Sequence, residues 1–171
     1  MSLIIGIGGA SQSGKSTLSK RLEKLFSQKK VHIIEMDKYT FLEKNIPKIN
    51  GLTNWEVPES IDFNKILEAI KDSRQNYDII IVEGMLAFIY ETLNKEYDLT
   101  IFMKIGKNTF IRRREKETRW GSEPAWYLKH VWEAYLRFGQ YPAADIVISG
   151  ENITSANDLT PIIQKINATM S

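Results

Sequence analysis

The chain has 171 residues, of which 43% are apolar and 26% charged, a composition typical of a globular protein rather than a disordered one. Its 23 Lys and Arg residues nearly balance 21 Asp and Glu residues, which argues against a nucleic-acid or membrane partner. The absence of cysteine excludes a disulfide framework and a thiolate metal site. We expect one cytoplasmic domain over residues 1–171, and the composition leaves its oligomeric state open.

Short apolar runs alternate with segments of helical periodicity in chain order. Residues 3–7 predict a buried strand, and the leucines that follow predict an amphipathic helix over residues 17–27. Four more strands are expected, over residues 31–34, 79–82, 99–103 and 146–148. Between the second and third strands, residues 39–60 are expected to be irregular because they contain Pro47, Gly51 and Pro58.

Helices are expected between these strands and after the last one. Ser60 or Asp62 is a candidate cap for a helix that reaches Ile70, and Ser155 is a candidate cap for the last helix. Residues 108–120 are expected to form a basic helix or lid segment, and an aromatic-rich helix is expected over residues 125–138. The alternation predicts an α/β fold with a five-stranded parallel sheet between two layers of helices. Ligands of such sheets bind outside the carboxyl ends of the strands.

The loop after the first strand has the pattern G-x-x-x-x-G-K-[ST] between a strand and a helix. Its residues are Gly9-Ala10-Ser11-Gln12-Ser13-Gly14-Lys15-Ser16. In such a P-loop, backbone N–H groups and the helix N-terminus hold nucleotide phosphates. We expect Lys15 to reach the β- and γ-phosphates, Ser16 to ligate Mg²⁺ and Thr17 to lie near the α-phosphate, with Gly9, Ser11, Ser13 and Gly14 shaping the loop. The structural alternative is a Gly/Ser-rich turn that caps a helix.

The chemistry that follows nucleotide binding is suggested by other parts of the chain. A GTPase would need D-x-x-G and N-K-x-D motifs, and the sequence has neither. A small kinase needs an acceptor pocket, an acid or base near the γ-phosphate and a mobile basic lid. The sequence offers a candidate for each, so we interpret it as a P-loop NTPase fold, three-layer α/β/α, with a small basic lid over about residues 108–124.

Two carboxyl groups follow strands of the predicted sheet. Asp37 comes directly after the second strand, where a carboxylate can accept the proton of an attacking hydroxyl or orient that hydroxyl. A turn-forming or helix-capping Asp is the structural alternative. Glu83 ends the third strand after four apolar residues, the Walker-B pattern whose carboxylate holds Mg²⁺ or its waters, with an exposed strand end as the alternative.

A basic segment follows the fourth strand. Arg112, Arg113, Arg114 and Arg119 stand there with three lysines and two glutamates. A solvated helix face with Glu–Arg pairs is one interpretation, and nucleic-acid binding is a second. We favour a kinase lid whose arginine stabilises the transferring phosphoryl group, with Arg114 and Arg119 as first candidates.

Aromatic residues flank the predicted acceptor region on both sides. Most aromatics at helical spacing belong to the core. A flat substrate can stack on such rings, and Tyr39, Trp55 and Trp132 are the candidates for that contact. We expect His130 to be a polar packing residue rather than a catalyst.

Taken together, the P-loop, Asp37, Glu83-Gly84 and the arginine segment resemble the uridine kinase and nicotinamide riboside kinase family. The resemblance is closer to the nicotinamide riboside kinases. It is carried by Trp55-Glu56-Val57-Pro58-Glu59-Ser60 and by His130-Val131-Trp132 with Tyr135.

This resemblance implies ATP-dependent phosphorylation of the 5′-hydroxyl of a ribosyl compound, either nicotinamide riboside or uridine and cytidine. It implies that Asp37 is the catalytic base, that Glu83 supports Mg²⁺ and substrate, and that Glu56 binds ribose hydroxyls. Arg114 would help to hold ribose or phosphate. The sequence departs from the family at two positions, since Lys38 stands where a second Asp is frequent and Glu56 stands where Asp is typical.

Three alternatives remain open from the sequence. A pantothenate-like metabolite or a nucleoside monophosphate could be the acceptor on the same scaffold, although a monophosphate would require more basic residues than the three lysines of residues 38–60. The chain could be a nucleotide-binding regulatory protein, or an ATPase that binds nucleic acid. Whether ATP or GTP is the phosphoryl donor is also open, and ATP with Mg²⁺ is our expectation.

Overall fold

A parallel five-stranded sheet is the centre of the computed structural model, which describes residues 2–118, 121, 123–151 and 159–170. Its strands are β1 (Leu3–Gly9), β2 (Val31–Glu35), β5 (Ile79–Glu83), β6 (Leu99–Lys104) and β7 (Ile146–Ser149). Their spatial order is β2-β5-β1-β6-β7, so β1 lies at the centre, and every pair is parallel. The five predicted strands and the α/β class are confirmed.

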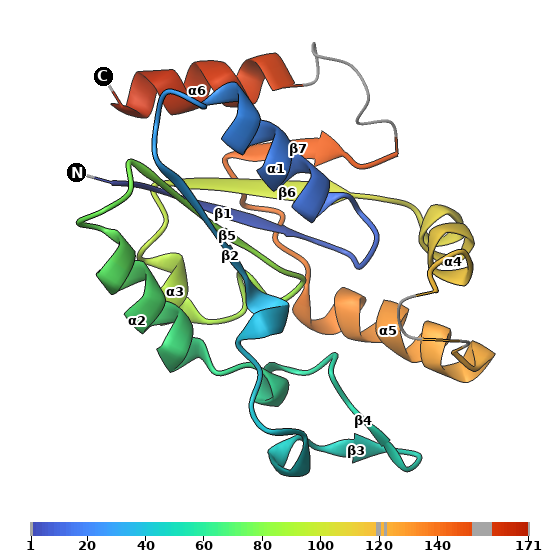
Figure 1. Ribbon diagram of the computed structural model, residues 1–171. Helices are drawn as coiled ribbons and strands as arrows, with labels where there is room; N and C mark the ends of the chain where they lie inside the picture. Colours follow the sequence, from blue (N-terminus) through green and yellow to red (C-terminus); the bar gives the residue numbers. More distant parts are fainter. Residues whose placement is uncertain (1, 119–120, 122, 152–158, 171) are drawn as a thin grey trace.

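Helices cover both faces of this sheet (Figure 1). One face carries α1 (Lys15–Leu25) and α6 (Thr160–Met170). The other face carries α2 (Phe63–Ser73), α3 (Glu91–Asn94) and α5 (Ala125–Phe138). The basic helix α4 (Lys107–Glu115) follows β6 and lies beyond the carboxyl ends of the strands, next to α5 (Figure 1). This arrangement leaves the P-loop, the acid groups and α4 at one edge of the sheet.

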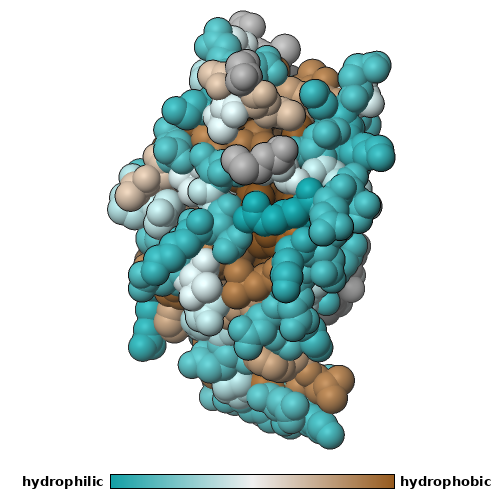
Figure 2. All heavy atoms as spheres, turned by 90° about the vertical axis from the view of Figure 1, so that its left-hand side faces the viewer, coloured by the Kyte–Doolittle hydropathy of each residue, from teal (hydrophilic) through white to brown (hydrophobic). Residues whose placement is uncertain are grey.

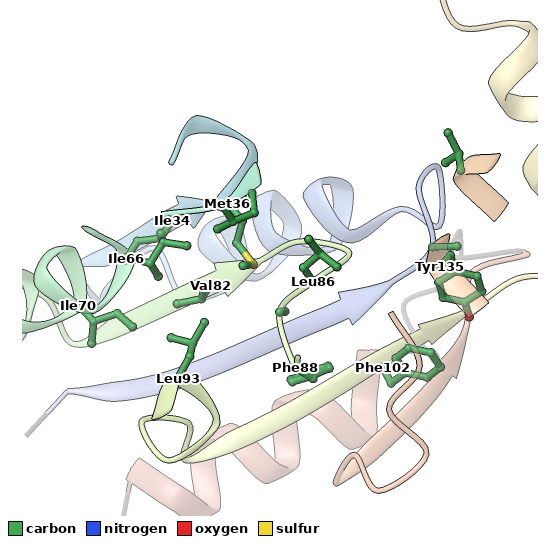
Figure 3. Close-up of a cluster of buried hydrophobic side chains, with 14 of the residues drawn as sticks. Ile34, Met36, Ile66, Ile70, Val82, Leu86, Phe88, Leu93, Phe102 and Tyr135 are labelled. Carbon is green, nitrogen blue, oxygen red and sulfur yellow. The ribbon is translucent and has the colours of Figure 1, made fainter. Parts of the chain in front are cut away.

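The two faces of the sheet build two separate apolar cores. Successive side chains of a strand point to opposite faces, so Ile79 and Ile81 pack with α1 and α6, whereas Ile80 and Val82 pack on the other side. Figure 3 shows the second core, where Ile34 and Val82 of the sheet meet side chains of α2 and of the segment after β5. Both faces being covered explains why β5 is a continuous apolar run in the sequence.

The surface at the opposite, amino edge of the sheet is mostly polar (Figure 2). Hydrophobic side chains gather at the lower end of that view, over the segment that follows β2, where Phe41, Leu42 and Leu52 are exposed. Among the helices of the described ranges, none has the length and apolar character that a membrane span requires.

The segment over residues 39–60 is more regular than the sequence analysis expected. It follows a short 3₁₀ helix, Met36–Lys38, and contains two more, Glu43–Asn45 and Pro58–Ser60. It also contains a hairpin of β3 (Lys48–Ile49) and β4 (Leu52–Thr53). Asn50 and Gly51 form its turn with φ of 46° and 80°. Asn-Gly is the preferred pair for such two-residue turns, so the sequence did carry the signal.

Two helix starts can be compared with expectation. The helix expected over residues 17–27 begins at Lys15, because Gly14 takes the left-handed φ of 97° that lets the chain turn from the P-loop directly into α1. Of the two candidate caps for α2, Asp62 is the one that acts, with its carboxylate accepting a hydrogen bond from Lys65 N. The proposed cap Ser155 lies outside the described residues.

Candidate active site

A cavity of about 970 Å³ opens at the carboxyl edge of the sheet. Its walls come from the P-loop, from the end of β5, from the segment after β2, and from the junction between α4 and α5. The cavity brings together seven predicted site residues, which are Ser11, Lys15, Ser16, Asp37, Glu56, Glu83 and Arg114. Segments far apart in the chain therefore converge where ligands of parallel sheets bind.

The P-loop curls tightly between β1 and α1. Ser13 N donates to the carbonyl oxygen of Ala10 at 3.1 Å, and Gln12 has a φ of 63°. Gly9 has a φ of 143°, and a Cβ built there would lie 2.3 Å from the carbonyl oxygen of Met103 on β6. Only glycine therefore fits at the start of the loop, where β1 and β6 run close together. Ser13 Oγ is buried without a hydrogen-bond partner in the described structure.

Lys15, Ser16 and Glu83 all line the cavity. Lys15 Nζ donates to the carbonyl oxygen of Ala10 at 2.9 Å, and Ser16 Oγ donates to Glu83 Oε1 at 2.5 Å. Burial lowers the pKa of Lys15, while the charges of Glu83, Asp37 and Glu56 act in the opposite direction. Burial likewise raises the pKa of Glu83, which Lys15 and the Ser16 hydroxyl oppose. Glu83 and Ser16 are thus already in contact, side by side at the helix N-terminus.

Asp37 and Glu56 line the same cavity from the segment that follows β2. Asp37 is exposed and lies in the short 3₁₀ helix that follows β2. Glu56 is partly buried, and burial raises its pKa to about 7, with Arg114 opposing and Asp37 reinforcing that shift. The two carboxyl groups and Lys15 interact electrostatically, so they belong to a single charge cluster.

Hydrogen bonds through Asn54 connect the segment that contains Glu56 to His130 of α5. His130 Nε2 lies 2.8 Å from Asn54 Oδ1, and the same oxygen accepts from Glu56 N at 3.4 Å. Because Oδ1 accepts from Glu56 N, His130 Nε2 is the donor in the pair. This contact fits the polar packing role expected for His130.

Two of the three arginines of α4, Arg113 and Arg114, reach back to the P-loop, whereas Arg112 is exposed. Arg113 donates to the carbonyl oxygens of Gln12 and Glu151, both at 2.9 Å. Arg114 is 7% exposed and donates to Ser11 Oγ at 2.7 Å. The structure therefore agrees with a basic segment packed over the nucleotide loop. Arg119 lies outside the described residues.

The structure does not bring every predicted aromatic into the cavity. Trp55 lines it, with Tyr127 of α5. Tyr39 and Trp132 instead pack against the core, and Trp132 lies on Phe110 and Tyr135 with ring centroids 5.3 and 5.1 Å apart. Trp132 follows the helical spacing of the buried face of α5, which is why its ring joins the core. Thr17 and the glycines of the P-loop lie in the loop and helix start without lining the cavity.

Sequence reasoning missed several cavity residues. Glu43, Thr53, Tyr127 and Glu123 line the cavity and were not singled out. Glu43 accepts a hydrogen bond from Thr53 Oγ1 at 2.6 Å, a contact that depends on the unrecognised hairpin. Glu123 pairs with Arg114, and no local pattern in the sequence marks it.

Comparison with known proteins places the chain in a family. Residues 4–76 match the Phosphoribulokinase / Uridine kinase family. Nicotinamide riboside kinase 1 of Homo sapiens is 30% identical over 154 residues, which cover 80% of this chain and 76% of that protein. The chain belongs to the nicotinamide riboside kinase and uridine kinase family of P-loop kinases. The family resemblance and the kinase class expected from the sequence are confirmed.

Two further comparisons concern the sequence and the fold. Uridine kinase of Brevibacillus brevis is 26% identical over 137 residues, covering 66% of this chain and 64% of that protein. A structure described as a possible uridine kinase from Bacillus stearothermophilus superposes with a TM-score of 0.59 at 16% identity, covering 86% of this chain and 88% of that one. The two chains therefore share a fold over most of their length.

The residues of the cavity fit ATP, which the family uses, and they also fit Mg²⁺. Lys15 and the amides of the curled loop form a donor set suited to phosphate oxygens. Glu83 and Ser16 offer adjacent oxygen ligands. Within the described ranges, His, Asp and Glu residues form no cluster of three or more that could hold a metal ion. Mg²⁺ is usually bound by one or two protein ligands together with phosphates and water.

Proposed function

We propose that this kinase transfers the γ-phosphoryl group of ATP to the 5′-hydroxyl of a ribonucleoside, with nicotinamide riboside as the first candidate acceptor. The observation that carries the proposal is the cavity itself. It joins the phosphate-binding loop to an acceptor wall with Asp37, Glu56 and Trp55. The named relatives act on nicotinamide riboside and on uridine, so both are candidate acceptors for this chain.

The chemistry assigned to the residues follows from their positions. ATP supplies the phosphoryl group, and Mg²⁺ neutralises phosphate charge when both are bound. Lys15 binds the β- and γ-phosphates, and Ser16 with Glu83 holds the metal. Asp37 orients the acceptor hydroxyl and takes its proton as the new oxygen–phosphorus bond forms and the bond to ADP breaks. Arg114 lies between the P-loop and Glu56, where its charge supports phosphate or ribose.

The charge of the cavity favours a cationic acceptor over an anionic one. Two cationic side chains, Lys15 and Arg114, stand against five carboxyl groups, which are Asp37, Glu43, Glu56, Glu83 and Glu123. An acceptor that carries its own phosphate would meet repulsion on this wall. The pyridinium ring of nicotinamide riboside carries a positive charge, whereas uracil is neutral. This excess of acid supports nicotinamide riboside ahead of uridine, and it weighs against a nucleoside monophosphate.

The test is a coupled ADP-release assay with four acceptors: nicotinamide riboside, uridine, cytidine and pantothenate. We expect nicotinamide riboside to give the highest kcat/KM and uridine monophosphate, added as a control, to give no turnover above background. The highest rate with uridine or cytidine would reverse the order of candidates. A rate of ADP release that is the same with and without every nucleoside would contradict the proposal and favour a nucleotide-binding regulatory protein.

A further inference from the structure

A largely buried ion pair in the cavity wall joins Arg114 of α4 to Glu123. Arg114 Nε donates to Glu123 Oε2 at 2.7 Å, and a second nitrogen, Nη2, donates to Oε1 at 2.8 Å. The side chains are 6% and 16% exposed. A two-bond contact of this kind fixes the plane of the guanidinium as well as its position.

The third nitrogen of the same guanidinium reaches the nucleotide loop. Arg114 Nη1 donates to Ser11 Oγ at 2.7 Å, so one side chain links the P-loop to the segment that precedes α5. Burial disfavours the charged form, yet the hydrogen bonds and charge of Glu123 raise the pKa of Arg114. Glu123 therefore orients this cation and offsets the cost of its burial.

A second carboxyl group competes for the same cation. The positive charge of Arg114 acts to lower the pKa of Glu56, on the acceptor wall, whereas the negative charge of Glu123 acts to raise it. Three hydrogen bonds of the guanidinium go to Glu123 and Ser11, and none of these three goes to Glu56. Glu123 and Glu56 are two carboxylates whose charges act on Arg114. If Glu123 lost its charge, Arg114 would be drawn toward Glu56 and away from Ser11.

We propose that Glu123 is a positioning residue of the kinase, which holds Arg114 against the P-loop and leaves Glu56 available to the acceptor. This inference rests on the proposed function, since it assigns Arg114 and Glu56 to the reaction site. Glu123 itself acts through Arg114 and needs no contact with either substrate. Its removal should impair use of the acceptor more than binding of ATP, because Lys15 and the P-loop amides remain in place.

A double-mutant cycle tests this coupling. The variants are Glu123→Gln, Arg114→Gln and the double variant, with Glu133→Gln as the matched control on the exposed side of α5, where Glu133 pairs with Lys129 at 3.6 Å. For each we would measure kcat and KM for the acceptor, and the dissociation constant of a non-hydrolysable ATP analogue. Glu123→Asp, which keeps the charge, serves as the conservative variant, and circular dichroism checks that every variant is folded.

We expect Glu123→Gln to lower acceptor kcat/KM at least tenfold and to change analogue binding less than threefold. In the Arg114→Gln background the same change should have less than a twofold further effect. Glu123→Asp should recover most of the loss, and Glu133→Gln should match the wild type. Equal losses in both backgrounds, or a wild-type rate for Glu123→Gln, would overturn the inference while leaving the proposed function intact. A wild-type enzyme with no acceptor-dependent ADP release would overturn both.

Discussion

Three ionisable side chains of this cavity are buried or partly buried. Lys15, Glu83 and Glu56 all have pKa values displaced by burial, in the direction that disfavours charge. Each is opposed by a neighbour of opposite charge. Burying charged groups in this way destabilises the protein without ligand, and a ligand that supplies opposite charges offsets that cost. Groups with displaced pKa values are common at active sites.

Asp37 is the residue whose assigned role is most directly testable. Asp37→Asn keeps the size of the side chain and removes its ability to take a proton. We expect kcat to fall at least about a hundredfold while binding of an ATP analogue is retained. Stopped ADP release with an unchanged melting temperature would support the assignment. Glu59→Gln, a nearby exposed carboxylate, is the control. Near-normal turnover by Asp37→Asn would mean that another group accepts the proton.

The raised pKa of Glu56 leads us to predict that kcat/KM for the acceptor depends on pH. Burial raises its pKa to about 7, and the ionised form is the better hydrogen-bond acceptor for ribose hydroxyls. Acceptor kcat/KM should therefore rise roughly tenfold between about pH 6 and pH 8. Glu56→Gln should remove that rise and lower the plateau. A rise that persists in Glu56→Gln would assign the titration to another member of the cluster.

The raised pKa of Glu56 also predicts that the stability of the fold decreases as the pH rises, whereas kcat/KM for the acceptor increases. A carboxyl group whose pKa is higher in the folded state stabilises the fold below its unfolded pKa, and this contribution is lost as the pH rises through about 7. Glu56→Gln should therefore raise the melting temperature at pH 8 more than at pH 5. Thermal unfolding at the two values measures this difference, and equal shifts at both would contradict the assigned pKa.

At the scale of elements, buried strands and amphipathic helices could be predicted because their pattern is local. The run Ile79–Val82 and the P-loop each carry their signal within a few residues. The hairpin of β3 and β4 has strands of two residues, too short to show a period, and only Asn50-Gly51 marked it. The contacts of Glu123 and Tyr127 with the cavity arise from packing between distant segments, which no local pattern encodes.

The hairpin gives a prediction about the acceptor wall. Gly51 has a φ of 80° in open space, so a side chain there meets backbone strain and no steric clash. Gly51→Val should destabilise the turn by about 1–2 kcal/mol, since a β-branched residue disfavours the left-handed region. Because Leu52, Thr53 and Trp55 follow the turn and line the cavity, acceptor KM should rise several-fold while analogue binding is unchanged. Lys44→Ala, an exposed change nearby, should leave both constants unaltered.

For the whole molecule, the parallel sheet makes ligand binding and folding interdependent. Its central strand β1 leads into the P-loop, while β5 ends in Glu83 and β6 leads into α4. The cavity therefore draws on several segments that only the folded sheet brings together. The sequence could predict that these strand ends share one edge, because all parallel strands end on the same side. The single-domain boundary and the Mg²⁺ ligands stay predictions.

This interdependence predicts stabilisation by nucleotide. An ATP analogue with Mg²⁺, present at about one hundred times its dissociation constant, should stabilise the folded protein by about 2.7 kcal/mol. For a chain of this size the melting temperature should then rise by roughly 5–10 °C. Lys15→Met removes the buried ammonium and keeps a side chain of similar length, so it should abolish most of the shift and all ADP release. The melting temperature of this variant without ligand is the control for its fold. A shift as large as that of the wild type would show that the analogue is held elsewhere, and the P-loop would lose its place as the donor site.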